Sequence, residues 1–291
     1  MEETIGTIGV MMADPGGGFI DTVLDWGLGV IRAVQVVASP PLTAVVEVIT
    51  ALGAVYFYIA AVLFIYWCIN ERLGARLAFL VLLTGCINSS LKEAFRQPRP
   101  YDLDPSLGKA YEATFGFPSG HAQSSLVFWW VGLTANLANH ANGKLIWLRR
   151  LGAVLIILLI GWTRLYLGVH FPTDLFGGWA LGILILLLYY LLDKPITKAL
   201  LQKDRQGGSL RIQCFTAAIV AIIMNTMTND SSLSGMFLGF GCGYALMLDR
   251  LGWHAGGIAW GKRLLSYFLG LGVVAIIYIG LSALLPKEGS A

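Results

Sequence analysis

The chain has 291 residues, of which 56% are hydrophobic and only 13% are charged, and its mean hydropathy is +0.70. Soluble domains carry about 25% charged residues, so this composition excludes an ordinary soluble protein and indicates a lipid environment. The net charge of +3 is too small and too dispersed to indicate a nucleic-acid partner.

Taken in chain order, apolar runs near the roughly 20 residues that a membrane helix needs predict an all-α, polytopic transmembrane helix bundle of about eight spans. The expected spans are 43–69, 75–95, 121–139, 148–167, 173–192, 212–228, 232–249 and 264–285. Residues 19–37 form a further segment that Asp21, Asp25 and Arg32 interrupt, although its apolar positions recur at helical spacing. We interpret it as an N-terminal amphipathic helix lying in the interface, with a ninth span as the alternative.

Basic residues predict how these spans are oriented. The loops after the first, third, fifth and seventh spans hold 13 of the 20 lysines and arginines. They are Arg72, Arg76, Lys144, Arg149, Arg150, Lys194, Lys198, Lys203, Arg205, Arg211, Arg250, Lys262 and Arg263. By the positive-inside rule these loops are cytoplasmic. We therefore expect an integral protein of the cell (inner) membrane, with the 96–120 loop and the 168–172 turn on the extracytoplasmic side.

A polar stretch at residues 203–209 predicts one internal boundary. It separates a core of residues 1–202, with the N-terminal interfacial helix, from a C-terminal three-span extension of residues 209–286. In the seventh span Gly235, Gly239 and Gly243 lie four apart and form one smooth helix face. We favour close packing of this face within the chain, with a homodimer seam as the alternative.

The four cysteines, Cys68, Cys86, Cys214 and Cys242, fall within or at the ends of apolar stretches and lack metal-ligand spacing. We interpret them as reduced packing residues. No set of histidine, cysteine and acidic residues has the spacing of a metal site, so we expect neither a metal ion nor another cofactor.

The chemistry-bearing residues gather at three span ends on the predicted outer face. They are Lys92, Arg96 and Arg99 after the second span, Ser119, Gly120 and His121 at the start of the third, and Arg164, His170 and Asp174 where the fourth meets the fifth. Taken singly, each has a simpler interpretation. A cation at a span end commonly extends to the headgroups, a serine before a helix caps it, and an aspartate after a proline does the same. Three such groups on one membrane face indicate a common site instead.

These residue types suit phosphoryl transfer. Lys92, Arg99 and Arg164 can neutralise phosphate oxygens, and the amides of Ser119 and Gly120 at a helix start can add backbone donors. Two histidines can divide the covalent work, because one attacks phosphorus as neutral imidazole while the other protonates the leaving oxygen. A carboxylate on the far ring nitrogen would orient the nucleophile, and the spacing to Asp174 suits that role.

The patterns KxxxxxxRP, PSGH and RxxxxxHxxxD, in this order over residues 92–174, resemble the type 2 phosphatidic acid phosphatase superfamily. That group includes lipid phosphate phosphatases, undecaprenyl-diphosphate phosphatases, glucose-6-phosphatases and vanadium haloperoxidases. The resemblance implies a helical core, metal-independent hydrolysis and an extracytoplasmic site. One position departs from the family pattern, since Thr163 stands where a serine is usual, but threonine keeps the hydroxyl.

Residue by residue, the resemblance implies that His170 is the nucleophile, Asp174 its partner and His121 the general acid. It implies a phosphate-binding role for the remaining matched positions, which are Lys92, Arg99, Ser119, Gly120 and Arg164.

Two further polar residues remain open. Glu47, about one turn inside the first span, could reach the site, but we favour a headgroup or water contact. Arg96 could contact either the rest of a substrate or the interface.

The expected function is hydrolysis of a lipid phosphate or lipid diphosphate through a phosphohistidine, with the substrate and the membrane lipids as partners. A phosphotransferase would use the same residues with an alcohol in place of water, and the sequence leaves that alternative open. A transporter is disfavoured, because its charges would be spread through the depth of the bundle rather than gathered at one face.

Overall fold

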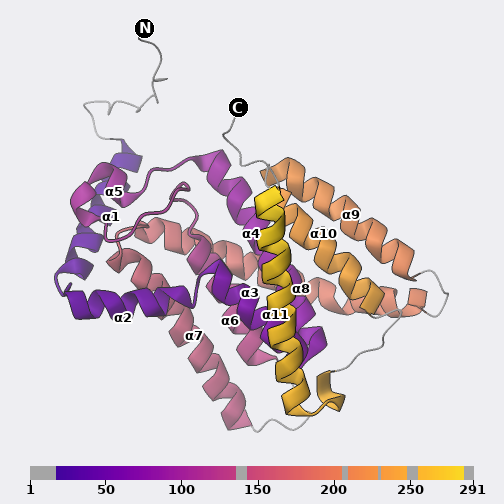
Figure 1. Ribbon diagram of the computed structural model, residues 1–291. Coiled ribbons are helices and arrows are strands. Elements are labelled where there is room, and N and C mark those ends of the chain that lie inside the picture. The colour runs from indigo at the N-terminus through magenta and orange to yellow at the C-terminus, as the bar shows by residue number, and fades with distance from the viewer. Residues whose placement is uncertain (1–17, 136–142, 205–208, 229–230, 248–254, 285–291) are drawn as a thin grey trace.

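The structure is a computed structural model that describes residues 18–135, 143–204, 209–228, 231–247 and 255–284. Every regular element within these ranges is helical, and Figure 1 shows them gathered in a single bundle. In chain order they are α1 (Phe19–Gln35), α2 (Pro40–Ala51), α3 (Val55–Phe64), a π-helical turn (Ile65–Ile69), α4 (Glu71–Phe95), α5 (Pro100–Leu103), a 3₁₀ turn (Pro105–Leu107), α6 (Gly120–Thr134), α7 (Gly143–Tyr166), α8 (Pro172–Asp204), α9 (Ser209–Thr228), α10 (Ser231–Leu246), a 3₁₀ turn (Ala255–Gly257) and α11 (Trp260–Leu284). The predicted all-α fold class is confirmed.

Five helices among the described residues are long and apolar enough to cross a bilayer, namely α4, α7, α8, α9 and α11. The number becomes six if α1 and α2, which are bent by 116° at their junction, form one span. Helices α6 and α10 have 15 and 16 residues, which is shorter than the roughly 20 residues that a membrane-spanning helix needs. The number of spans therefore remains a prediction, while the outward apolar side chains of α7 and α11, such as Leu155 and Ile276, agree with an integral membrane protein.

The run 43–69, predicted as one continuous span, is divided in the structure. Helix α2 ends at Ala51, and α3 begins at Val55 after a short turn. Gly53 in this turn lets two neighbours approach closely, because an added Cβ would lie 2.8 Å both from His121 Cδ2 and from Ile160 Cγ2. The break therefore brings the turn at Gly53 against α6 and α7, beside His121, the predicted general acid.

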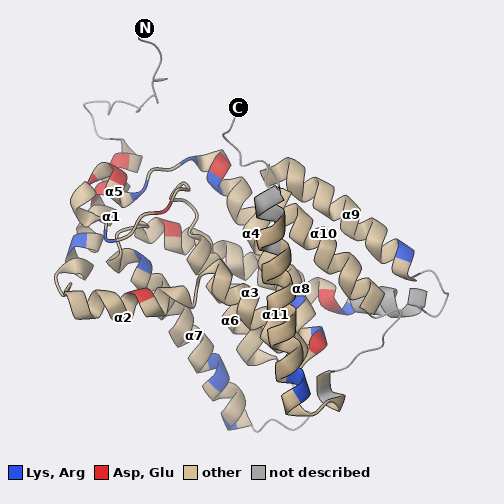
Figure 2. Cartoon of the chain, viewed as in Figure 1, with Lys and Arg blue, Asp and Glu red and all other residues tan. Residues whose placement is uncertain are grey.

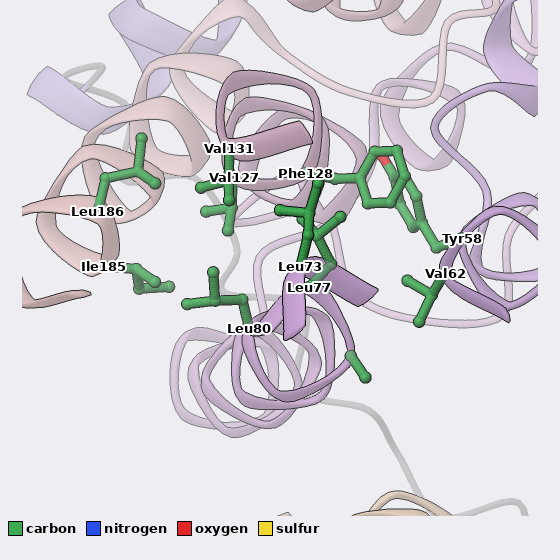
Figure 3. Close-up of a cluster of buried hydrophobic side chains, with 11 residues drawn as sticks. Tyr58, Val62, Leu73, Leu77, Leu80, Val127, Phe128, Val131, Ile185 and Leu186 are labelled. Carbon is green, nitrogen blue, oxygen red and sulfur yellow. The ribbon is translucent and has the colours of Figure 1, made fainter. Parts of the chain in front are cut away.

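The main core lies between α3, α4, α6 and α8 (Figure 3). Leu77 of α4 and Val127 of α6 are fully buried there, and Tyr58, Phe128 and Ile185 pack around them. Within a bilayer such a core is held by close van der Waals packing rather than by exclusion of water. This packing joins the first half of α4 to the second half of α6, and the site is built on the opposite ends of these two helices.

Helices α9, α10 and α11 lie together on the side of the bundle away from α1 and α2 (Figure 1). Helices α9 and α10 pack against each other and against α4, and α11 packs against α3 and the π-helical turn. A boundary at residues 203–209 remains a prediction, since residues 205–208 lie outside the described ranges.

The glycine face of α10 differs from our expectation. A Cβ added at Gly235, Gly239 or Gly243 would meet no described atom within 4 Å, so the prediction of close packing inside the chain is wrong. The glycine that packs closely is Gly241, where an added Cβ would lie 2.9 Å from Ala217 Cβ of α9. The four-residue spacing identified a smooth face but not the face turned toward α9, and a homodimer seam remains untested.

Charges are unevenly distributed along the bundle. Figure 2 shows basic residues at the lower ends of α7 and α11 and a group of acidic residues around α1 and α5 at the opposite end. An ion pair also joins α4 to α8, in which Arg76 Nη2 lies 3.0 Å from Asp193 Oδ1. Three further cations, Lys92, Arg99 and Arg164, are buried, and they belong to the candidate site.

Candidate active site

Segments distant in the sequence meet at one end of the bundle. The loop after α4, the start of α6 and the turn between α7 and α8 are joined by direct hydrogen bonds. Ser119 N donates to Asp174 O at 3.0 Å, and Arg99 Nη1 donates to Val169 O at 2.7 Å. The three regions that carry the sequence motifs therefore converge, and the resulting site is largely buried.

His170 lies in the turn between α7 and α8, where only 1% of its side chain is exposed. Gly168 makes this turn possible, because its φ is +67° and an added Cβ would lie 2.0 Å from Leu107 O. Asp174 Oδ2 lies 3.2 Å from His170 Nδ1 and accepts a hydrogen bond from Phe171 N at 2.9 Å. The carboxylate therefore favours the tautomer with hydrogen on Nδ1, which puts the lone pair of the ring on Nε2.

The environment of His170 also keeps its ring neutral. Burial lowers the pKa of His170 well below its ordinary value, and the nearby Arg164 and Arg99 lower it further. A neutral imidazole retains the lone pair that nucleophilic attack requires. Nε2 is turned toward the cations, at 3.4 Å from Arg99 Nη1, so an oxyanion held by these cations would lie next to the nucleophilic atom.

The three predicted cations are buried, with 1% of Arg99, 3% of Arg164 and 7% of Lys92 exposed. This burial excludes the interpretation that they merely extend to the headgroups. Arg99 is fixed by bonds from Nε to Thr114 O at 2.6 Å and from Nη2 to Thr114 Oγ1 at 3.0 Å. Arg164 is fixed by a bond from Nη1 to Thr50 Oγ1 at 2.8 Å. We call Lys92, Arg99 and Arg164 the cation cluster.

Glu112 is a member of the site that the sequence did not reveal. Its carboxylate is ion-paired with Arg99 Nη2 at 2.8 Å and also with Arg164 Nη2. Its Oε2 lies 3.8 Å from His170 Nε2. Glu112 comes from the middle of the loop between α5 and α6, which has no periodic pattern. The one signal that could have suggested it is electrostatic, because three buried cations require anions nearby.

Charge on the cluster stabilises the ionised form of Glu112. Burial alone would raise the pKa of its carboxyl, but Arg164 and Arg99 outweigh burial and hold the pKa below its usual value. His121 and Lys92 act in the same direction, which places both beside this carboxylate. The predicted residues thus surround Glu112, which is negatively charged at neutral pH.

The start of α6 differs in one respect from our expectation. Ser119 caps the helix, since its Oγ accepts a hydrogen bond from Ala122 N at 3.4 Å, but its own amide is already bound to Asp174 O. The expectation that this amide is free for phosphate is therefore wrong. Gly120 begins the helix, and an added Cβ there would lie 3.0 Å from Asn88 Oδ1. His121 follows in the first turn, with its ring against Gly53.

Two supporting groups were also missed. Gln97 Nε2 donates to Asp174 Oδ1 at 2.8 Å and so fixes the second carboxylate oxygen. Asn88 Nδ2 donates to Gln123 Oε1 at 2.8 Å and to Pro118 O at 3.2 Å, which ties α4 to the start of α6. Such amides resemble ordinary helix and loop residues in a sequence, because only their partners reveal their role.

The two residues left open lie at the edge of the site. Arg96 is exposed, ends α4 with φ of 47°, pairs with Glu93 at 3.4 Å and lies over the ring of Phe115. Glu47 is exposed on α2 and lines a groove of about 450 Å³ together with Lys109. Neither has a direct contact with the cation cluster among the contacts of the described residues. A headgroup or water contact therefore remains our expectation for Glu47.

Fold and site together define an all-helical integral membrane protein whose buried histidine, carboxylates and cations suit an oxyanion such as phosphate. The pattern of the PAP2 superfamily matches residues 73–198, and that of the transmembrane extension of PAP2 superfamily phosphatases matches residues 231–291. The chain is also 31% identical over 177 residues to phosphatidylglycerophosphatase B of Bacillus subtilis, covering 57% of this chain and 83% of that protein. The chain belongs to the PAP2 superfamily.

Other relatives agree with this assignment. Mouse sphingosine-1-phosphate phosphatase 2 is 29% identical over 141 residues, which cover 48% of this chain but only 39% of that protein. The crystal structure of a transmembrane PAP2-type phosphatidylglycerolphosphate phosphatase from Bacillus subtilis superposes with a TM-score of 0.54 at 26% identity. This superposition covers 60% of this chain and 88% of that one, so part of the present chain has no counterpart there.

Proposed function

We propose that this protein hydrolyses a lipid phosphate or lipid diphosphate through a phosphohistidine on His170. The observation that carries the proposal is the buried His170–Asp174 pair, in which the Nε2 atom of His170 faces the cation cluster at 3.4 Å from Arg99 Nη1. The names of the relatives support a lipid substrate. Phosphatidylglycerophosphate is the first substrate to test, because that relative matches over most of its length.

The proposed reaction has two steps. In the first, His170 Nε2 attacks phosphorus, the bond to the leaving oxygen breaks, and His121 donates a proton to that oxygen. In the second, water attacks phosphorus, His121 accepts the proton of that water, and the bond to Nε2 breaks to release inorganic phosphate. Asp174 stabilises the charge that the ring of His170 acquires during attack.

Phosphate binding is assigned to the cation cluster with Ser119 and Gly120. The three cations neutralise charge on the equatorial oxygens as the transition state forms. The Gly120 amide, first in α6, is the backbone donor that remains for a phosphate oxygen, while Ser119 shapes the helix start as its cap.

The proposed function is tested by measuring hydrolysis of phosphatidylglycerophosphate, sphingoid-base phosphates and isoprenoid mono- and diphosphates by the purified protein. Release of no phosphate from any of them would refute the proposal.

Activity is expected to survive excess chelator, because side-chain cations here take the place that metal ions hold in other phosphatases. Among the described residues, no group of three histidine, cysteine or acidic side chains is arranged to hold a metal ion. Vanadate is expected to inhibit, since its five-coordinate adduct on His170 would mimic the transition state. The measurement is the rate with and without EDTA. Loss of activity that magnesium or zinc restores would contradict this mechanism.

The site is expected to face away from the cytoplasm, because 13 of the 20 basic residues fall in the opposite set of loops. Ser106 lies exposed in the loop between α5 and α6. A cysteine introduced at Ser106 should react with an impermeant thiol reagent in intact cells, whereas one at Gly207, in the predicted cytoplasmic stretch, should react only after permeabilisation. The reverse pattern would overturn this topology.

A further inference from the structure

One short loop segment supplies oxygen atoms to all three members of the cation cluster. Glu112 pairs with Arg99 and Arg164, Thr114 accepts two hydrogen bonds from Arg99, and the carbonyl of Phe115 accepts one from Lys92. These oxygens therefore occupy the donors that the proposed function assigns to a phosphate group. We call residues 109–116, which carry them, the strap.

The strap is fastened at its two ends and at its middle. Lys109 N donates to Leu167 O at 3.0 Å, and Gly116 N donates to Gln97 O at 2.8 Å. In the middle, the Tyr101 hydroxyl donates to Glu112 O at 2.9 Å and accepts from Glu112 N at 3.2 Å. Because the strap is held by its own backbone, the Glu112 side chain can leave the cluster without unfolding the loop.

The Glu112 carboxylate does not use the full donor capacity of the cluster. Arg164 Nε is buried and has no hydrogen-bond partner among the described residues. A carboxylate offers two oxygens, whereas a phosphate group offers at least three, and arginine binds phosphate through more than one nitrogen. The cluster therefore has a donor to spare for a larger oxyanion, and the single carboxylate of Glu112 offsets only part of the charge of its three cations.

We propose that Glu112 is an intramolecular competitor for phosphate, which leaves the cation cluster when a substrate phosphate enters and returns as inorganic phosphate departs. The competition rests on the proposed function. The carboxylate and a phosphate oxygen cannot accept from the same N–H groups, so a phosphate that takes the N–H groups now paired with Glu112 must displace its ion pairs. Glu112 consequently weakens the binding of every phosphate ligand and hastens release of the product.

The test compares Glu112→Gln with wild type. Glutamine keeps the shape but lacks the charge, so inorganic phosphate should inhibit hydrolysis with a Ki lower by about tenfold or more, on the scale of a charge-assisted hydrogen bond. Stabilisation of the purified protein by phosphate in thermal unfolding should move to correspondingly lower phosphate concentrations. Glu93→Gln is the matched control, because the Glu93 side chain is exposed and its ion pair is with Arg96 rather than with a member of the cluster, and its Ki should equal that of wild type.

An opposite role for Glu112 gives the opposite result. If the carboxylate only holds the arginines in position, Glu112→Gln should weaken phosphate binding, and an unchanged or raised Ki would overturn the proposal.

Tyr101→Phe provides a second variant, since it keeps the charge of Glu112 but removes both hydrogen bonds that hold the backbone of residue 112. Glu112 should then compete less well for the cluster, and the proposal requires the Ki for phosphate to fall in this variant as well. Should Glu112→Gln fail to fold, an unchanged Ki in Tyr101→Phe refutes the proposal. Failure of the wild-type protein to hydrolyse lipid phosphates would refute the proposed function instead, and the thermal measurement would still test Glu112.

Discussion

Replacing His170 with alanine is expected to lower the hydrolysis of every lipid phosphate substrate by about 10⁴-fold or more, the scale of loss when a covalent catalyst is deleted. The reason is that alanine removes Nε2, the atom that would carry the phosphoryl group, and no other described imidazole has the same carboxylate support. Rapid acid-free quenching of protein mixed with radiolabelled substrate measures the phosphoenzyme directly. Wild type should show protein-bound phosphate, and His170→Ala should show none.

Two companion variants make this result specific. Asp174→Asn keeps the shape but presents an amide to Nδ1, which favours the wrong tautomer of His170. The activity of Asp174→Asn should therefore lie between that of wild type and that of His170→Ala. His140→Ala is the matched control, because the sequence places His140 in a predicted cytoplasmic loop, and full activity is expected. Phosphoenzyme in the His170→Ala variant would assign the nucleophile to another residue.

The convergence of the site could be predicted because it depends on short-range chemistry. His170 and Asp174 are four residues apart, so a single helix start brings their side chains together, and the structure places them 3.2 Å apart. Lys92, Ser119 and Arg164 each lie at an end of a predicted span, and the predicted alternation of the spans puts these three ends on one membrane face. The helical class followed in the same way from the apolar runs.

The missed features depend on which surfaces meet, which no local pattern records. Glu112 lies in an irregular loop, and only its ion pairs with Arg99 and Arg164 give it a role. The division of the first span depends on the approach of His121 and Ile160 to Gly53, so its signal is tertiary. For the same reason the glycine spacing of α10 predicted a smooth face without revealing what covers it.

Replacing His121 with alanine is expected to produce a loss that depends on the leaving group. For an alkyl phosphate, whose alkoxide leaves poorly without a proton, the rate should fall by about 10²–10⁴-fold, the usual contribution of general acid catalysis. For p-nitrophenyl phosphate, whose leaving group is stable without a proton, much of the rate of the first step should persist. Because His121 would also activate water in the second step, phosphoenzyme should accumulate with this substrate.

The measurement is the rate of each variant on both substrates, together with the amount of trapped phosphoenzyme. His170→Ala is the comparison, since it removes the nucleophile and should lose activity equally with both leaving groups. A His121 that merely packs against Gly53 at the start of α6 predicts equal losses with the two substrates, because a displaced helix start would harm binding of the phosphate common to both. A loss in His121→Ala that shows no dependence on the leaving group would therefore remove His121 from the role of general acid and leave it as a packing residue.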